Sequence, residues 1–259
     1  MPDPEYVVMK LVAPILGFLI ANAMFFSGVP GMLRCKRDGS LGDMNPLPFP
    51  VVLANCVSWI IYSILIEDYF LFFSNAPGTM VGLYFTLVAY GLSPYKSKMR
   101  DALEAWLMSF TFALLALTLY VGIVAMDKSV EHKKTVVGLF ANFVLLIYYA
   151  APLTTVKQVI VTRNSRSLYL PLAVANTVNG GAWFVYGIAL RDLFIMVPNG
   201  VGAVLGALQL VLICVFPSKH DTSPPPSFRG GLGSTQDLLE SQGEEHGGEH
   251  GGGKAELEE

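Results

Sequence analysis

The chain contains seven apolar stretches of about 20 residues or more, each long enough to cross a lipid bilayer as a helix. They lie at 7–29, 46–66, 69–92, 103–126, 135–160, 167–190 and 192–216. Hydrophobic residues make up 53% of the chain and charged residues only 14%, which excludes a single soluble domain. The first stretch follows acidic residues and not a basic segment, so we interpret it as a retained span and not as a signal peptide. The sequence therefore predicts an all-α membrane protein with seven transmembrane helices.

Basic residues beside the spans predict the orientation, because Lys and Arg are retained preferentially on the cytoplasmic side. One side receives Arg34, Lys36, Arg37, Lys96, Lys98, Arg100, Lys157, Arg163, Arg166 and Lys219. The other side receives only Lys10, Lys128, Lys133, Lys134 and Arg191. We therefore expect the N-terminus outside and the C-terminus in the cytosol, with the plasma membrane as the expected location and an endomembrane as the alternative. The Gly-, Ser- and Glu-rich segment 217–259 is predicted to be a disordered cytosolic tail.

An internal repeat appears when the chain is compared with itself at an offset of 124 positions. Nine residues between Asn55 and Gly82 recur at the same spacing between Asn179 and Gly206. The repeat pairs spans two and three with six and seven, and span one with five, so the fourth span has no counterpart. We expect two parallel three-helix repeats joined by one linker helix (3+1+3), an arrangement found in transporters. The predicted units are 1–95, 96–130 for the linker helix, and 131–216.

The repeated residues form polar stripes on helices. Asn, Trp and Tyr stand at i, i+4 and i+7, which places them on one helical face. The next span of each unit carries an Asn followed by two glycines four residues apart, which allow close helix contact. A polar amide in hydrocarbon needs partners, so symmetric pairs of asparagines predict a shared cavity. The two stripes and the two following asparagines are Asn55, Trp59 and Tyr62; Asn179, Trp183 and Tyr186; and Asn75 and Asn199.

The predicted cavity has the chemistry of a sugar site, because indole faces stack on the C–H faces of a sugar ring and amides pair with its hydroxyls. No acidic or basic residue is expected in it, which disfavours a charged substrate and coupling to protons. We interpret Asp68 and Asp192 as caps at the starts of the third and seventh helices. The three cysteines show no disulfide or zinc spacing, His246 and His250 fall in the low-complexity tail, and the net charge of −3 does not indicate nucleic acid. No metal or cofactor is expected.

The motifs NCVSWIIY with FFSNAPG, and NGGAWFVYG with MVPNGVG, resemble those of the SWEET sugar transporters. The resemblance covers residues 7 to about 216. It implies that Trp59, Asn75, Trp183 and Asn199 line a central sugar site, with Asn55 and Asn179 facing the same pocket. It also implies kinked hinge prolines, which transfer to Pro48, Pro152 and Pro171, with either Gly28 or Pro30 in the first helix. Self-association, as a homotrimer, is a further expectation of this resemblance.

We expect facilitative transport of a sugar by alternating access. A seven-helix cargo or sorting receptor built on the same repeat is the alternative. A retinal protein is disfavoured because 192–216 contains no lysine, and no catalytic constellation for an intramembrane enzyme is found. Tyr148 in the fifth helix, and Phe26 or Met24 in the first, are expected to narrow the pocket together with Asn55 and Asn179. The sequence thus predicts a monosaccharide such as glucose over sucrose.

Overall fold

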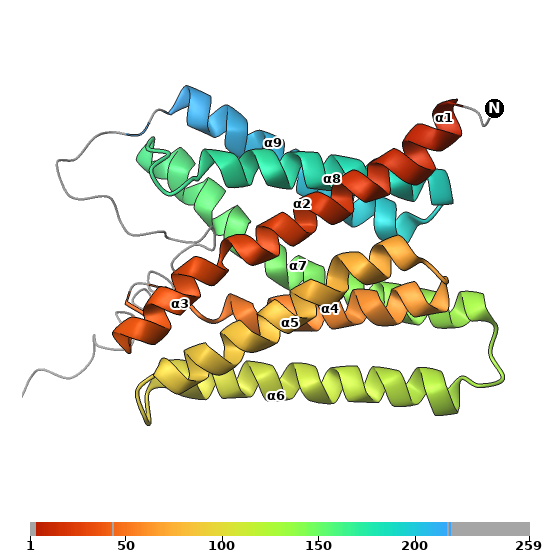
Figure 1. Cartoon of the computed structure of the whole chain (residues 1–259), viewed down its shortest axis with the longest axis horizontal. Coiled ribbons are helices and arrows are strands. Elements are labelled where there is room, and N and C mark those ends of the chain that lie inside the picture. Colours follow the sequence, from red (N-terminus) through yellow and green to blue (C-terminus); the bar gives the residue numbers. More distant parts are fainter. Residues whose placement is uncertain (1–3, 43, 217, 219–259) are drawn as a thin grey trace, which may run out of the picture.

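The structure is a computed structural model that describes residues 4–42, 44–216 and Ser218. Within these residues its regular secondary structure is entirely helical, with no β-strand (Figure 1). The elements are α1 (Pro4–Val7), η1 (Val8–Val12), α2 (Ala13–Ser27), α3 (Val29–Asp38), α4 (Pro48–Leu65), α5 (Tyr69–Leu92), α6 (Lys98–Leu119), η2 (Tyr120–Val124), α7 (Val130–Thr162), α8 (Leu170–Leu190) and α9 (Leu193–Val215). The predicted tail at 217–259, including His246 and His250, lies outside the described residues except for Ser218.

The seven predicted spans are confirmed as seven long helical segments, the first being continuous from α1 to α3 apart from a turn at Gly28. Six of these segments are both long and apolar enough to cross a membrane by length and composition. The exception is α8, which is long enough but carries polar residues including Asn176, Thr177 and Asn179. The first segment also runs past the predicted end at residue 29 to Asp38, where Gly39 in the left-handed region (φ 68°) ends it.

Side chains cap four of the helices in the way that short polar residues favour. Asp68 accepts a hydrogen bond from the Leu71 amide at 2.9 Å, and Asp192 accepts from the Phe194 amide, also at 2.9 Å. Ser97 and Ser129 cap α6 and α7 in the same manner. The predicted capping roles of Asp68 and Asp192 are therefore confirmed. We call the end of the bundle that carries these two residues the Asp end.

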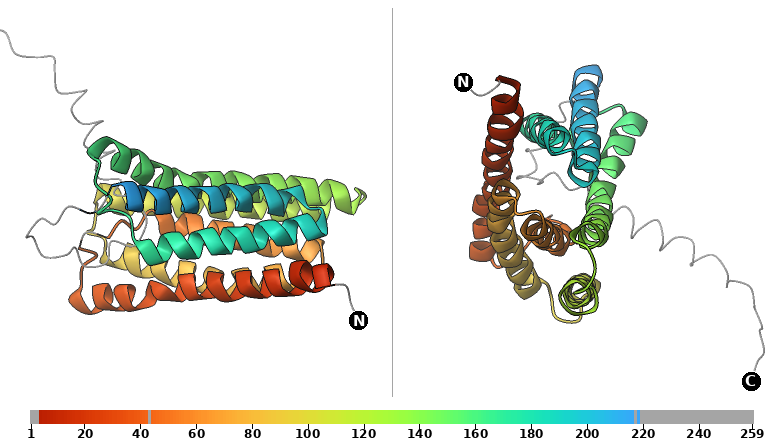
Figure 2. Two further views of the ribbon diagram at one scale, coloured as in Figure 1. Left: turned by 90° about the horizontal axis from the view of Figure 1, so that it is seen from above. Right: turned by 90° about the vertical axis from the view of Figure 1, so that its right-hand side faces the viewer.

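The helices form two triplets joined by α6. The first triplet contains α2 with α3, α4 and α5, and the second contains α7, α8 and α9. The first long helix of each triplet packs against helices of both: α2 contacts α5 and also α8, while α7 contacts α9 and also α4. Figure 2 shows the bundle from the side and from its end, with the long helices running lengthwise through it at different tilts. Each triplet thus packs against the other through its own first long helix.

Packing contacts show that the offset of 124 also holds for the first helix of each triplet. Gly78 of α5 faces the ring of Phe25, and its equivalent Gly202 of α9 faces the hydroxyl of Tyr149. Phe25 and Tyr149 are themselves 124 positions apart. By this register Gly28 is the equivalent of Pro152, and the first helix is interrupted at Gly28.

The predicted hinge prolines occupy two kinds of position. Pro152 lies inside α7, where its missing N–H and its ring favour a kink. Pro30, Pro48 and Pro171 lie in the first turns of α3, α4 and α8, where a missing N–H costs little. The sequence analysis did not single out Pro77 and Pro198, which lie inside α5 and α9.

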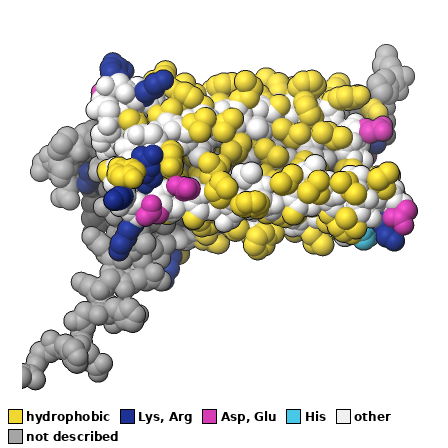
Figure 3. Space-filling model, turned by 90° about the horizontal axis from the view of Figure 1, so that it is seen from below, with side chains coloured by type: hydrophobic (Ala, Val, Ile, Leu, Met, Phe, Trp, Pro, Cys, Tyr) yellow, Lys and Arg dark blue, Asp and Glu magenta, His cyan; other side chains and the backbone are white. Residues whose placement is uncertain are grey.

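The surface has the distribution of side chains expected in a bilayer. Figure 3 shows hydrophobic side chains covering the middle of one face, with charged side chains gathered at its two ends. Large apolar residues are widely exposed, among them Met80 at 74% and Val204 at 68%. A water-soluble protein rarely exposes so continuous an apolar surface. The chain is an integral membrane protein.

Candidate functional site

A cavity of about 180 Å³ lies between the two triplets. Six helices supply its wall, and all six site residues expected from the sequence line it. The lining comprises Ala21, Met24, Phe25, Val52, Asn55, Trp59, Leu71, Ser74, Asn75, Leu145, Tyr148, Tyr149, Asn176, Asn179, Gly180, Trp183, Asn199 and Gly202. Phe26, one of the two residues expected in the first helix, is not part of it, whereas Met24 is.

The two indoles occupy equivalent places on α4 and α8. Trp59 and Trp183 are each 5% exposed, so their orientation is fixed by packing. Each packs edge-on against the tyrosine three residues later, with ring centroids 5.6 Å apart for Tyr62 and 5.8 Å apart for Tyr186. Trp183 also packs against Gly17 of α2, where an added Cβ would stand 2.7 Å from the indole Nε1. Packing therefore holds both indole rings in place before a ligand binds.

Asn75 and Asn199 present their carbonyl oxygens as acceptors. The Asn75 Nδ2 donates to the Leu71 carbonyl at 2.8 Å, and the Asn199 Nδ2 donates to the Ile195 carbonyl at the same distance. Because a backbone carbonyl only accepts, these bonds fix which end of each amide points away from its helix. The remaining Oδ1 atoms suit the hydroxyl donors of a sugar.

Asn55 and Asn179 stand one helical turn before each Trp, and each has an unpaired side-chain oxygen. The Oδ1 atom of each is buried and has no hydrogen-bond partner among the described residues. A buried amide without partners is destabilising, so such groups in a native protein need an explanation. A ligand with several hydroxyls would supply the missing bonds.

The sequence analysis missed three polar residues of the cavity. Ser74 and Tyr149 already have partners, since Ser74 donates to the Phe70 carbonyl at 2.7 Å and the Tyr149 hydroxyl donates to the Pro198 carbonyl at 2.9 Å. Asn176 lies one turn before Asn179 on α8, and that spacing was the one signal in the sequence that could have identified it.

The cavity lining contains no Asp, Glu, Lys, Arg or His among the residues that the structure describes. A charged ligand in this setting would lose hydration without gaining a counter-ion, which costs far more than burying a neutral hydroxyl with a partner. Aromatic faces, amide acceptors and amide donors together favour a neutral polyhydroxylated ligand.

At the Asp end, two reciprocal hydrogen bonds join the triplets. The Tyr62 hydroxyl of the first triplet donates to Asp192 Oδ2 of the second at 2.7 Å. The Tyr186 hydroxyl of the second donates to Asp68 Oδ2 of the first at 2.6 Å. All four side chains are buried. Because each carboxylate also caps its own helix, the pairs join the triplets through fixed helix ends.

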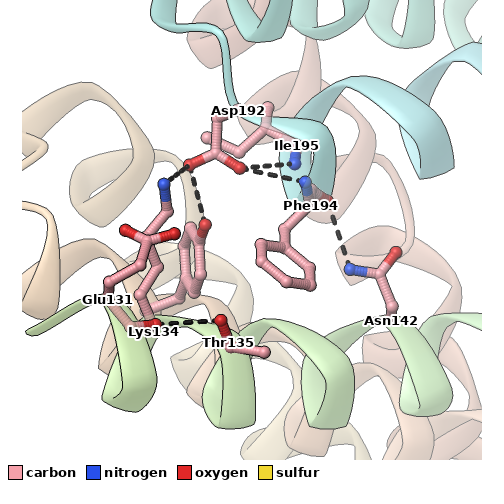
Figure 4. Close-up of polar contacts among 8 residues, drawn as sticks. Glu131, Lys134, Thr135, Asn142, Asp192, Phe194 and Ile195 are labelled. Carbon is pink, nitrogen blue, oxygen red and sulfur yellow. Dashed lines mark hydrogen bonds and ion pairs between the residues drawn. The ribbon is translucent and has the colours of Figure 1, made fainter. Parts of the chain in front are cut away.

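The two Tyr–Asp pairs differ in one ion pair (Figure 4). Lys134 of α7 lies 3.2 Å from Asp192 Oδ2, whereas its equivalent Lys10 lies over the ring of Tyr6 at 5.2 Å. Asn142, further along α7, donates to the Phe194 carbonyl at 3.2 Å and so ties α7 to the start of α9. Asp192 is thus held more firmly within its own triplet than Asp68.

These features define a helical membrane protein with two parallel triplets around a central, uncharged, amide- and indole-lined site. The model of a family described as "Sugar efflux transporter for intercellular exchange" matches residues 12–98 and again residues 135–221. The chain belongs to this family, the SWEET family. The two matches fall on the two triplets.

Similar proteins agree with this assignment. The chain is 30% identical over 200 residues to "Sugar transporter SWEET1" of Drosophila pseudoobscura pseudoobscura, covering 75% of this chain and 85% of the relative. It is 27% identical over 225 residues to "Bidirectional sugar transporter SWEET4" of Arabidopsis thaliana, with 84% and 85% covered. A solved eukaryotic SWEET transporter matches with a TM-score of 0.74 at 23% identity, covering 83% of this chain and 99% of that chain, which shows the shared fold.

Proposed function

We propose that this protein is a facilitative sugar transporter with a single central site between its two triplets. The observation that carries the proposal is the symmetric pairing of two buried indoles and four cavity-facing asparagines in a wall without charged residues. Similar proteins whose names describe sugar transport support it. Because no acidic group lies in the cavity to carry a proton, the transport is uniport, driven by the sugar gradient alone.

Alternating access requires that the closure at one end of the cavity break while the other forms. The Tyr–Asp bonds are the closure at the Asp end, which we assign to the outside of the plasma membrane from the distribution of basic residues. The units 1–95 and 131–216 then rock about the predicted hinges at Gly28 or Pro30, Pro48, Pro152 and Pro171, with 96–130 as the linker.

The size of the cavity supports a monosaccharide as substrate. Its volume of about 180 Å³ is below the range of roughly 300–1,000 Å³ in which drug-sized ligands bind. Asn55, Asn179 and Tyr148 all narrow it. A hexose such as glucose therefore fits the proposal better than sucrose.

The test is uptake of labelled glucose into proteoliposomes that contain only this protein, with no ion gradient imposed. We expect saturable uptake that stops when the internal and external concentrations are equal. The Trp59→Ala and Trp183→Ala variants should lose it while remaining folded. Sugar binding without any net movement would favour the alternative function, a cargo or sorting receptor. Assembly into homotrimers remains a prediction, to be tested by the mass of the protein in detergent.

A further inference from the structure

The cavity is symmetric in some of its residues and asymmetric in others. At the offset of 124, three pairs of lining residues are identical: Trp59 with Trp183, Asn55 with Asn179, and Asn75 with Asn199. Four further pairs that line the wall differ. In three of them the second triplet supplies the more polar side chain: Val52 with Asn176, Met24 with Tyr148, and Phe25 with Tyr149. The fourth pair, Ala21 with Leu145, is apolar in both triplets.

Asn176 is the clearest of these differences. It is half-buried on α8, with no hydrogen bond to any described residue, and it lines the cavity one turn before Asn179. The equivalent position on α4 is Val52, which offers only methyl groups. Tyr148 likewise has a hydroxyl without a hydrogen-bond partner among the described residues, opposite a methionine in the first triplet. The hydroxyl of Tyr149 is already bonded to Pro198.

A hexose has no twofold symmetry, so a symmetric site would hold it equally well in two orientations related by the axis between the triplets. An unpaired amide on one side and methyl groups on the other make those orientations unequal, because only one of them pairs the amide with a hydroxyl. The orientation without this bond leaves the half-buried Asn176 amide unpaired against the bound sugar, which is unfavourable.

We propose that Asn176 is a specificity-determining residue that fixes one binding orientation of the sugar, by accepting or donating a hydrogen bond to one particular hydroxyl. Val52 contacts the C–H surface on the opposite side of the bound ring. This inference rests on the proposed function, and it adds that the two halves of the site are not equivalent towards the substrate.

The test compares Asn176→Val with the exchange variant Val52→Asn/Asn176→Val in proteoliposomes. Asn176→Val removes the difference between positions 52 and 176, and we expect the half-saturation concentration for glucose to rise roughly fivefold, as for the loss of one neutral hydrogen bond. The exchange variant restores one amide on the other side of the axis. It should regain most of the affinity, with the sugar bound in the inverted orientation. Asn22→Val, an Asn replacement in α2 outside the cavity lining, is the matched control and should leave half-saturation unchanged.

A series of monodeoxyglucoses identifies the hydroxyl. The wild type should transport one of these sugars less well than glucose, because that sugar lacks the hydroxyl that pairs with Asn176. Asn176→Val should no longer distinguish this sugar from glucose, while its preferences among the other monodeoxyglucoses should match the wild type. A merely structural defect would not produce this pattern. Half-saturation and a deoxy profile equal to the wild type in Asn176→Val would overturn the inference and leave sugar transport standing. An exchange variant as weak as Asn176→Val would overturn the orientation argument. A wild-type protein that moves no sugar would overturn the proposed function and this inference with it. If Asn176→Val does not insert, Asn176→Ser serves in the same comparison.

Discussion

Removing the hydroxyl of Tyr62 or Tyr186 should make the Asp end of the cavity open more often. Each hydroxyl donates to a buried carboxylate of the other triplet, at 2.7 Å and 2.6 Å. Hydrogen bonds to charged groups contribute about 1.5–3 kcal/mol each. Opening of this end separates the triplets and breaks both bonds, so each Tyr→Phe change shifts the equilibrium towards the open state by roughly 10- to 150-fold. The two effects need not add, because the pairs lie close together.

The assay is alkylation of a cysteine that replaces Ser74 in the cavity wall, in protein whose three native cysteines have been replaced. A membrane-impermeant maleimide is added from the side of the Asp end. We expect labelling to be at least tenfold faster in Tyr62→Phe and Tyr186→Phe than in the parent, by the same energy range. Tyr120→Phe is the control, because it removes an exposed hydroxyl that bonds His132 and joins no triplets. Equal labelling rates in all four proteins would refute the assignment of these pairs as the closure.

Three further predictions concern coupling, size and packing. Collapse of a proton gradient with an ionophore should leave the initial rate of glucose uptake unchanged, and a full loss of uptake would show that the transport is proton-coupled. Asn55→Ser with Asn179→Ser should raise the rate of sucrose relative to glucose, because both side chains narrow the cavity; an unchanged ratio in paired uptake assays would place the size limit elsewhere. Gly17→Ala should raise the half-saturation concentration for glucose by displacing the Trp183 indole, whereas Gly91→Ala, which has nothing within 4 Å, should not.

The sequence predicted the helices and the main wall of the site because both depend on local spacing. Apolar length defines a span, and residues at i, i+4 and i+7 share a face whatever the partner helix is. The internal repeat added long-range information, because the same stripe twice indicates two facing walls. All of Asn55, Trp59, Asn179 and Trp183 accordingly reached the cavity.

The remaining features depend on which helices touch. No spacing in the sequence indicates that Tyr62 reaches Asp192, 130 residues away, because that contact joins α4 to the start of α9, and both of these helices pack against α7. The sequence shows that Asn176 is polar. It does not show that this side of α8 faces the cavity, because that depends on how α8 packs against the other helices. The equivalence of Gly28 and Pro152 likewise required the contacts of Phe25 and Tyr149.

The central claim is that a sugar binds between Trp59 and Trp183, and the chain contains only one other tryptophan, Trp106. Trp106 packs against Phe110 on α6 and does not line the cavity. In a Trp106→Phe variant, all indole fluorescence comes from the two site residues. Titration with glucose should change this emission saturably, with the half-saturation concentration found for transport by the same variant. Transport that saturates with no change in emission over that concentration range would contradict the account.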